Sequence, residues 1–240
     1  MAIKNNRMDK YSRMFTTVLG IGKHSDNPTH NACMTCKSNC KFPLIPFWVG
    51  DKYGERKKIV FAGKSHLDGH LYGFNSDSVD SVVADLLPCN DHSFWRISRN
   101  ILNLVYTGAE YSWDYSIVTN LIKCSTGISG DSVDKTSQSM VNSCLYQTKI
   151  FFEEMKIAKP DFLIIYAHSL LHDEDRFVTE YKESTSSISF NKLDRLNSKY
   201  YFQPYHLQYN DHVTNILITR HPQGTTSDYQ NMIVDWILSK

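Results

Sequence analysis

The sequence lacks any long run of apolar residues. No segment approaches the ~18 apolar residues that a membrane-spanning helix requires, so we expect no membrane partner. The first residues, Met1-Ala-Ile-Lys-Asn-Asn-Arg7, contain neither the apolar core nor the small-residue cleavage site of a secretory signal. We therefore expect a cytoplasmic protein whose cysteines stay reduced, where metal or cluster ligation is favoured over disulfides.

An internal repeat and a second domain are also lacking. The 240 residues are predicted to form a single domain, with a cysteine-bearing arm over about 1–50. The net charge is only +1, but it is unevenly distributed. Residues 1–70 carry 12 Lys and Arg against 5 Asp and Glu, whereas the remainder carries 14 against 20. A basic first third suits a polyanionic partner, although a solvated lysine-rich surface explains it equally well.

Four short apolar runs predict buried strands, at 58–63, 115–122, 161–166 and 213–218. Helical spacing predicts helices at 93–105, 133–156 and 228–238, and a loop is expected at 184–189. Strands separated by helices indicate a parallel sheet covered on both faces. The predicted fold is a three-layer α/β/α domain with a central four-stranded parallel sheet.

Polar residues follow each predicted strand, and in a parallel sheet these positions meet at one edge, where ligands bind. They include Gly63 to Asp68, Asn120 to Cys124, His168 and His221. We expect the functional site at this edge.

Cysteines form two separated groups. Cys33 and Cys36 are spaced as Cys-x2-Cys, whereas Cys124 follows a predicted strand and Cys144 lies on a predicted helix. Four gathered thiolates bind either an iron–sulfur cluster or tetrahedral zinc. Cys40 could replace one of these ligands.

Taken in order, these segments resemble the uracil-DNA glycosylase superfamily, and most closely its iron–sulfur (family 4) branch. The resemblance rests on four motifs: the early Cys-x2-Cys, Val118-Thr-Asn-Leu-Ile-Lys-Cys124, Lys159-Pro-Asp-Phe-Leu-Ile164 and the final His221-Pro222. The resemblance implies a [4Fe–4S] cluster held by Cys33, Cys36, Cys124 and Cys144, with zinc as the alternative. It also implies that the cluster clamps the N-terminal arm to the sheet.

The first motif departs from the family pattern. The family carries an acidic residue and Pro-Gly soon after the glycine, but this chain reads Gly63-Lys-Ser-His-Leu-Asp-Gly69. The family's Arg-Pro-Pro stretch after the cysteine is replaced by Ser125-Thr-Gly-Ile-Ser-Gly130. These changes surround the expected base pocket.

The resemblance implies roles for individual residues. His221 would donate a hydrogen bond to the oxyanion that develops on the departing base. Asn120 would read the base edge, and Phe94, with Trp95 as a rival, would stack on the flipped base. Within the altered motif, Gly63, Ser65 and His66 are expected to contact the base. The resemblance carries over no catalytic acid there, and we expect Asp68, five residues after Gly63, to position water or stabilise the sugar cation.

The predicted function is therefore a monomeric DNA glycosylase that flips out uracil or a modified pyrimidine and leaves an abasic site. Lys and Arg at 52–64, with Arg96, Arg99 and Arg220, are expected to contact phosphates. Three alternatives stay open: the same scaffold specialised for a bulky modified cytosine of viral DNA, in a defence role; a non-catalytic iron–sulfur protein that binds nucleic acid; and a zinc-stapled hydrolase of small nucleosides.

Overall fold

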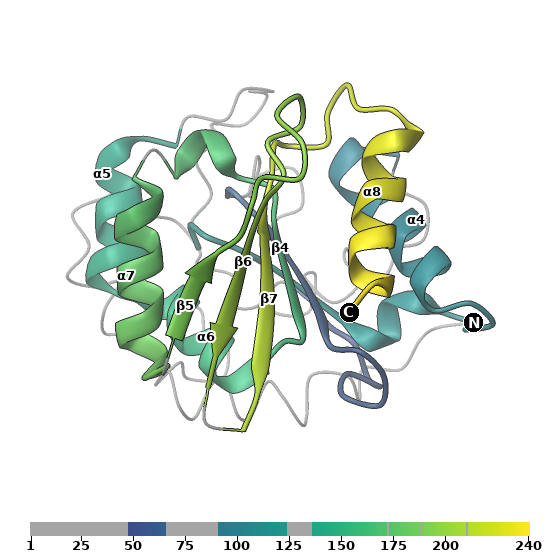
Figure 1. The fold of residues 1–240 in the computed structure, drawn as a ribbon, viewed down its shortest axis with the longest axis horizontal. Helices are drawn as coiled ribbons and strands as arrows, with labels where there is room; N and C mark the ends of the chain where they lie inside the picture. The colour runs from purple at the N-terminus through teal and green to yellow at the C-terminus, as the bar shows by residue number, and fades with distance from the viewer. Residues whose placement is uncertain (1–47, 66–90, 124–135, 172, 188, 210) are drawn as a thin grey trace, which may run out of the picture.

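A mixed sheet forms the centre of the protein. The computed structural model describes residues 48–65, 91–123, 136–171, 173–187, 189–209 and 211–240. Within them, the sheet has seven strands in the order β1-β3-β2-β4-β7-β6-β5 (Figure 1). The strands are β1 (Trp48–Val49), β2 (Ile59–Gly63), β3 (Ser116–Asn120), β4 (Phe162–Ile165), β5 (Ser189–Lys192), β6 (Gln203–Gln208) and β7 (Val213–Ile218).

The four predicted strands are all present and adjacent, because β3, β2, β4 and β7 pair in parallel. A sheet of only four strands is nevertheless wrong. β1 pairs antiparallel with β3, while β6 and β5 extend the other edge in antiparallel pairing. β1 has only two residues, and β5 and β6 carry more polar residues than the four predicted strands, so each gives a weaker signal in the sequence.

Helices cover both faces of the sheet, as an α/β fold requires (Figure 1). On one face lie α4 (Ser93–Val105) and α8 (Ser227–Leu238), which pack against each other. On the other lie α5 (Gln138–Val141), α6 (Ile150–Ala158) and α7 (Glu174–Thr185). Each layer buries its own hydrophobic cluster against the sheet. In the part of the chain that the structure describes, no helix is long and apolar enough to cross a bilayer.

The single helix predicted over 133–156 is interrupted. A π-helical turn (η2, Asn142–Gln147) follows α5, and Lys149 then adopts a left-handed conformation, with φ of 56°, before α6 begins. Neither glycine nor proline occurs at this break, so the sequence carried no ordinary signal for it. The break matters because η2 carries Cys144.

The strand order places a topological switch point between β2 and β4. From the carboxyl end of β2 the chain crosses to β3 on one side, whereas from β4 it crosses to β5 at the opposite edge and returns through β6 to β7. Connections that diverge in this way leave a crevice beyond the strand ends, where α/β proteins bind ligands. The candidate site is built around this point.

Candidate functional site

Gly63 and Asn120 face each other at the carboxyl ends of two adjacent parallel strands. They are register partners in β2 and β3. A Cβ atom at position 63 would lie 2.5 Å from Oδ1 of Asn120 and 3.3 Å from Cε2 of Phe94. Three residues predicted to bind the base therefore converge, and a side chain at position 63 would displace the Asn120 amide.

Phe94 is fixed by aromatic neighbours at the switch point. Its ring meets those of Trp95 and Tyr166 edge-on, at centroid distances of 5.0 and 5.5 Å. Tyr166, directly after β4, stacks in turn on Phe61 of β2 at 5.9 Å. Burial raises the pKa of the Tyr166 hydroxyl, which stays neutral at physiological pH. The Phe94 ring is thus preorganised beside Asn120, with most of its surface already buried.

His221 lies after β7, partly exposed, near the start of α4. Its ring centroid is 6.4 Å from that of His92, two residues before Phe94. The backbone N–H of Gln223 donates to Nδ1 of His221 at 3.3 Å. In the neutral ring an accepting Nδ1 leaves the proton on Nε2. This hydrogen bond favours the neutral tautomer of His221 that carries its proton on Nε2.

Only part of the first motif falls within the described residues. The backbone pairing of β2 and β3 continues past Gly63, since the Ile122 N–H donates to the Lys64 carbonyl at 2.8 Å. Ser65 follows, with its hydroxyl 3.0 Å from that of Thr136. His66 and Asp68 lie outside the described residues. Ser65 is thus tied to the segment that leads into α5.

Of the predicted cluster ligands, Cys144 is described, whereas Cys33, Cys36 and Cys124 lie outside the described residues, as does Cys40. Cys144 is buried in η2, and its Sγ accepts a hydrogen bond from the Lys123 N–H at 3.2 Å. Lys123 immediately precedes Cys124 in the sequence. A buried sulfur that accepts an amide hydrogen bond fits a cluster thiolate. Within the described ranges, no group of three or more metal-ligating side chains occurs.

A buried ion pair lies beneath the strand end. Lys123 Nζ is 2.5 Å from Oε2 of Glu154 in α6, and both side chains are fully buried. Thr119 donates to the same carboxylate at 2.7 Å, and the Lys123 ammonium lies 5.4 Å from the Phe151 ring centroid. Burial lowers the pKa of Lys123, and the attraction of Glu154 opposes that shift. The pair fixes the β3 end between Asn120 and the cysteine position.

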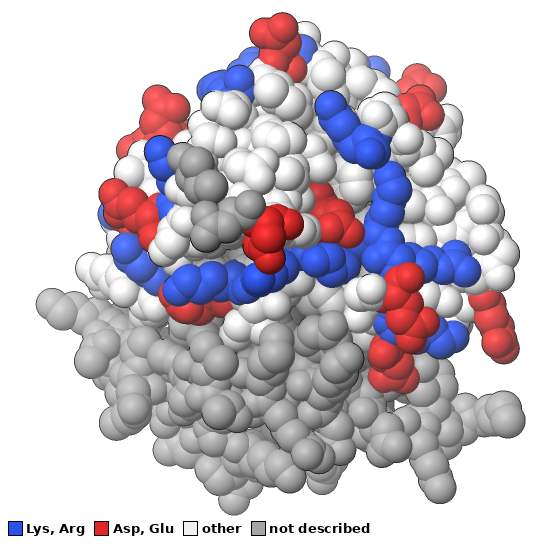
Figure 2. All heavy atoms as spheres, turned by 60° about the horizontal axis from the view of Figure 1, so that its bottom comes forward, with Lys and Arg blue, Asp and Glu red and all other residues white. Residues whose placement is uncertain are grey.

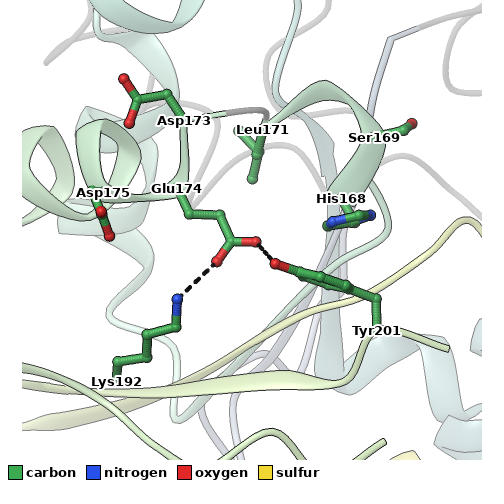
Figure 3. Close-up of a pocket in the computed structure, with 8 residues that line it drawn as sticks. All are labelled: His168, Ser169, Leu171, Asp173, Glu174, Asp175, Lys192 and Tyr201. Atoms are coloured by element: carbon green, nitrogen blue, oxygen red, sulfur yellow. Dashed lines mark hydrogen bonds and ion pairs between the residues drawn. The ribbon is translucent and has the colours of Figure 1, made fainter. Parts of the chain in front are cut away.

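A polar cavity of about 530 Å³ opens next to this edge, beyond β4 and at the start of α7 (Figure 3). Its lining includes His168, whose ring lies against that of Tyr201, with centroids 3.3 Å apart and planes inclined by 30°. Glu174 points between Tyr201 and Lys192, accepting hydrogen bonds from both (Figure 3). The Tyr205 hydroxyl also donates to Glu174, at 2.5 Å. Burial raises the pKa of Glu174, but these donors outweigh it and the net pKa is lowered.

This cavity was not predicted, because 172–210 showed only mixed polar and aromatic residues. One signal could have found the helix beside it. Asp173 accepts from the Arg176 N–H at 2.9 Å, and an aspartate ahead of a charged, amphipathic stretch is a typical N-cap.

Comparison with known proteins adds no relative: no family model matches the chain, and no curated protein matches it significantly.

Proposed function

We propose that the protein is a DNA glycosylase that hydrolyses the bond between a flipped pyrimidine and its deoxyribose. The observation that carries the proposal is the convergence of Gly63, Asn120 and Phe94 at the switch point. Glycine allows close approach to the ligand, the amide offers a donor and an acceptor side by side, and the aromatic ring offers a face or edge to a base.

The chemistry follows from the arrangement of these groups. As the C1′–N bond breaks, negative charge develops on the base and is spread onto its carbonyl oxygen. An oriented Nε2–H of His221 stabilises that charge most when little water surrounds it. Asn120 holds the base edge and discriminates against bases with the opposite pattern of donors and acceptors. Water then adds to C1′; Asp68 is our candidate for positioning it.

The surroundings of Cys144 fit one ligand position of a cluster-binding site. Cys33, Cys36, Cys124 and Cys144 would hold a [4Fe–4S] cluster, which supplies a structural clamp between the N-terminal arm and β3. The amide hydrogen bond from Lys123 to Cys144 supports this assignment over an inert buried thiol.

A bulky modified cytosine is the second candidate substrate. The specific observation in its favour is the polar cavity beside His168 and Tyr201, at the same edge as Asn120. Its hydroxyl, carboxylate and imidazole groups could accommodate a polar substituent on the base, which a tight uracil pocket excludes.

A base-release assay tests the proposal. DNAs containing uracil, hypoxanthine, hydroxymethylcytosine or its glucosylated form are incubated with wild type, His221→Ala and the control His206→Ala, a partly exposed residue in β6. We expect release of one base, reduced about 100-fold or more in His221→Ala and unchanged in the control. No release from any DNA by protein with its full cluster would reject the glycosylase and leave the non-catalytic binding protein.

A further inference from the structure

Lysine and arginine side chains form a band across the lower edge of the molecule in Figure 1, where the parallel strands begin (Figure 2). Two chain segments lie side by side there: 50–58, which leads into β2, and 158–161, which joins α6 to β4. Tyr53 donates to the Ala158 carbonyl at 3.1 Å, and the Asp161 N–H donates to the Lys58 carbonyl at 2.9 Å. The basic residues of this edge are Lys52, Arg56, Lys57, Lys58, Lys156 and Lys159.

Much of this positive charge has no acidic partner. Lys58 pairs with Asp161 at 3.8 Å and Lys156 with Glu153 at 2.8 Å. In the described ranges, by contrast, no carboxylate lies within ion-pair distance of the other four, which are Lys52, Arg56, Lys57 and Lys159. Exposed Asp51 and Glu55, in the same segment, offset part of their charge. A surplus of positive charge remains along the edge.

Part of the band is held in place by an aromatic ring. Arg56 and Lys52 lie over Tyr115, with their charged groups 4.6 and 5.7 Å from its centroid. Contact with a ring face restrains a cation without neutralising it. These two charges are therefore presented to solvent from defined positions.

The band cannot serve the candidate base pocket. Lys58 immediately precedes β2, whereas Gly63 ends it, and a five-residue strand spans roughly 17 Å. Phosphate contacts around the site were predicted for Lys and Arg at 52–64; of these, Lys64 directly follows Gly63, whereas 52–58 lie toward the opposite edge of the sheet. A duplex seated at the carboxyl edge would leave these cations unused.

We propose that this band is a second DNA-binding surface, which holds a duplex segment other than the one presented to the base pocket. The charges are strung out in a line, which matches a phosphate backbone, rather than converging as they would on a single phosphate group. Contacts of this kind are independent of sequence and weaken steeply with salt.

The test measures binding of undamaged duplex DNA by fluorescence anisotropy across salt concentrations. The variant is Lys52→Ser/Arg56→Ser/Lys159→Ser, and the control for the loss of a single charge is Lys182→Ser, an exposed residue of α7 that is not part of the band. Each phosphate that the protein neutralises contributes about 0.9 to the magnitude of the negative slope of log K against log salt. The triple variant loses up to three such contacts, so we expect the magnitude of its slope to be smaller by about two to three. We expect no change in the control.

Lys159→Ser alone, which leaves the Tyr115 contacts intact, should lower the slope by about one. Wild-type slope and affinity in both variants would overturn the proposal. So would a loss of binding to anionic lipid vesicles with DNA binding unchanged, because the partner would then be a membrane surface.

This proposal does not depend on catalysis, and the two can fail separately. A slope that falls in the triple variant, together with no base release from any DNA, would retain the band and reject the glycosylase. Base release together with an unchanged slope would retain the glycosylase and reject the band as a DNA-binding surface.

Discussion

Gly63 shows how a single missing side chain shapes the candidate site. The Cβ of alanine would lie 2.5 Å from Asn120 Oδ1, so the amide must move or the strands must separate. We expect Gly63→Ala to fold but to lower the rate of base release at least 10-fold. Measuring kcat and KM separately will show whether binding of the base is lost.

The control for this substitution is Gly108→Ala. Gly108 has a φ of 76°, and a Cβ atom added there would meet no other atom within 4 Å. Alanine there should cost about 1 kcal/mol of stability through backbone strain, with unchanged base release. If Gly63→Ala behaved like this control, Asn120 would not be the group that contacts the base.

At the scale of elements, the Lys123–Glu154 pair joins the end of β3 to α6. Both side chains are fully buried, so removing one leaves the other charge without compensation. We expect Lys123→Met to lower the free energy of unfolding by about 3–5 kcal/mol, measured by urea denaturation. The double variant Lys123→Met/Glu154→Leu should recover most of that loss. Equal destabilisation of the single and double variants would contradict this account.

Glu174 joins the start of α7 to β6 and the preceding loop, through Tyr205 and Tyr201. Its folded-state pKa is lowered from 4.5, because hydrogen bonds from both tyrosines and Lys192 outweigh the effect of burial. The resulting stability is therefore present above pH 4.5 and is lost as the pH falls through the folded-state value. The Tm of Glu174→Gln should consequently fall less than that of wild type as the pH is lowered below 4.5.

A matched variant on the same helix separates this effect from general acid sensitivity. Exposed Glu183, near the end of α7, has no tyrosine partner among the described residues. Glu183→Gln should follow the wild-type Tm at every pH. If Glu174→Gln did the same, the Glu174 hydrogen bonds would not contribute to the acid dependence.

On the scale of the whole molecule, the sequence was most informative where strands are buried on both faces. The runs that became β2, β3, β4 and β7 are apolar along their whole length, and parallel pairing places their ends together. β6 was missed because its residues, QPYHLQ, mix polar and aromatic types and include a proline. The break at Lys149 had no local signal, since packing rather than propensity decides it.

The residues of the candidate site also differ in whether the sequence could predict their placement. Gly63 and Asn120 could be predicted as neighbours, because each ends a strand of one parallel sheet. The cavity at Glu174 could not, because its residues come from a helix, a loop and an edge strand that sequence periodicity did not reveal. The orientation of His221 likewise depends on the Gln223 N–H, which no residue pattern specifies.

A cluster between the N-terminal arm and β3 would tie together parts of the chain that are far apart in sequence. Cys144 is the one predicted ligand whose surroundings are described, and a hydroxyl at that position binds iron far more weakly than a thiolate. We expect Cys144→Ser to lose most of the iron and the brown colour of purified protein, and to lower the Tm, because the metal's binding energy contributes to folding. Cys89→Ser, which changes a cysteine outside the predicted ligand set, should retain both. Full iron content in Cys144→Ser would transfer the ligand role to another cysteine, with Cys40 the first to test.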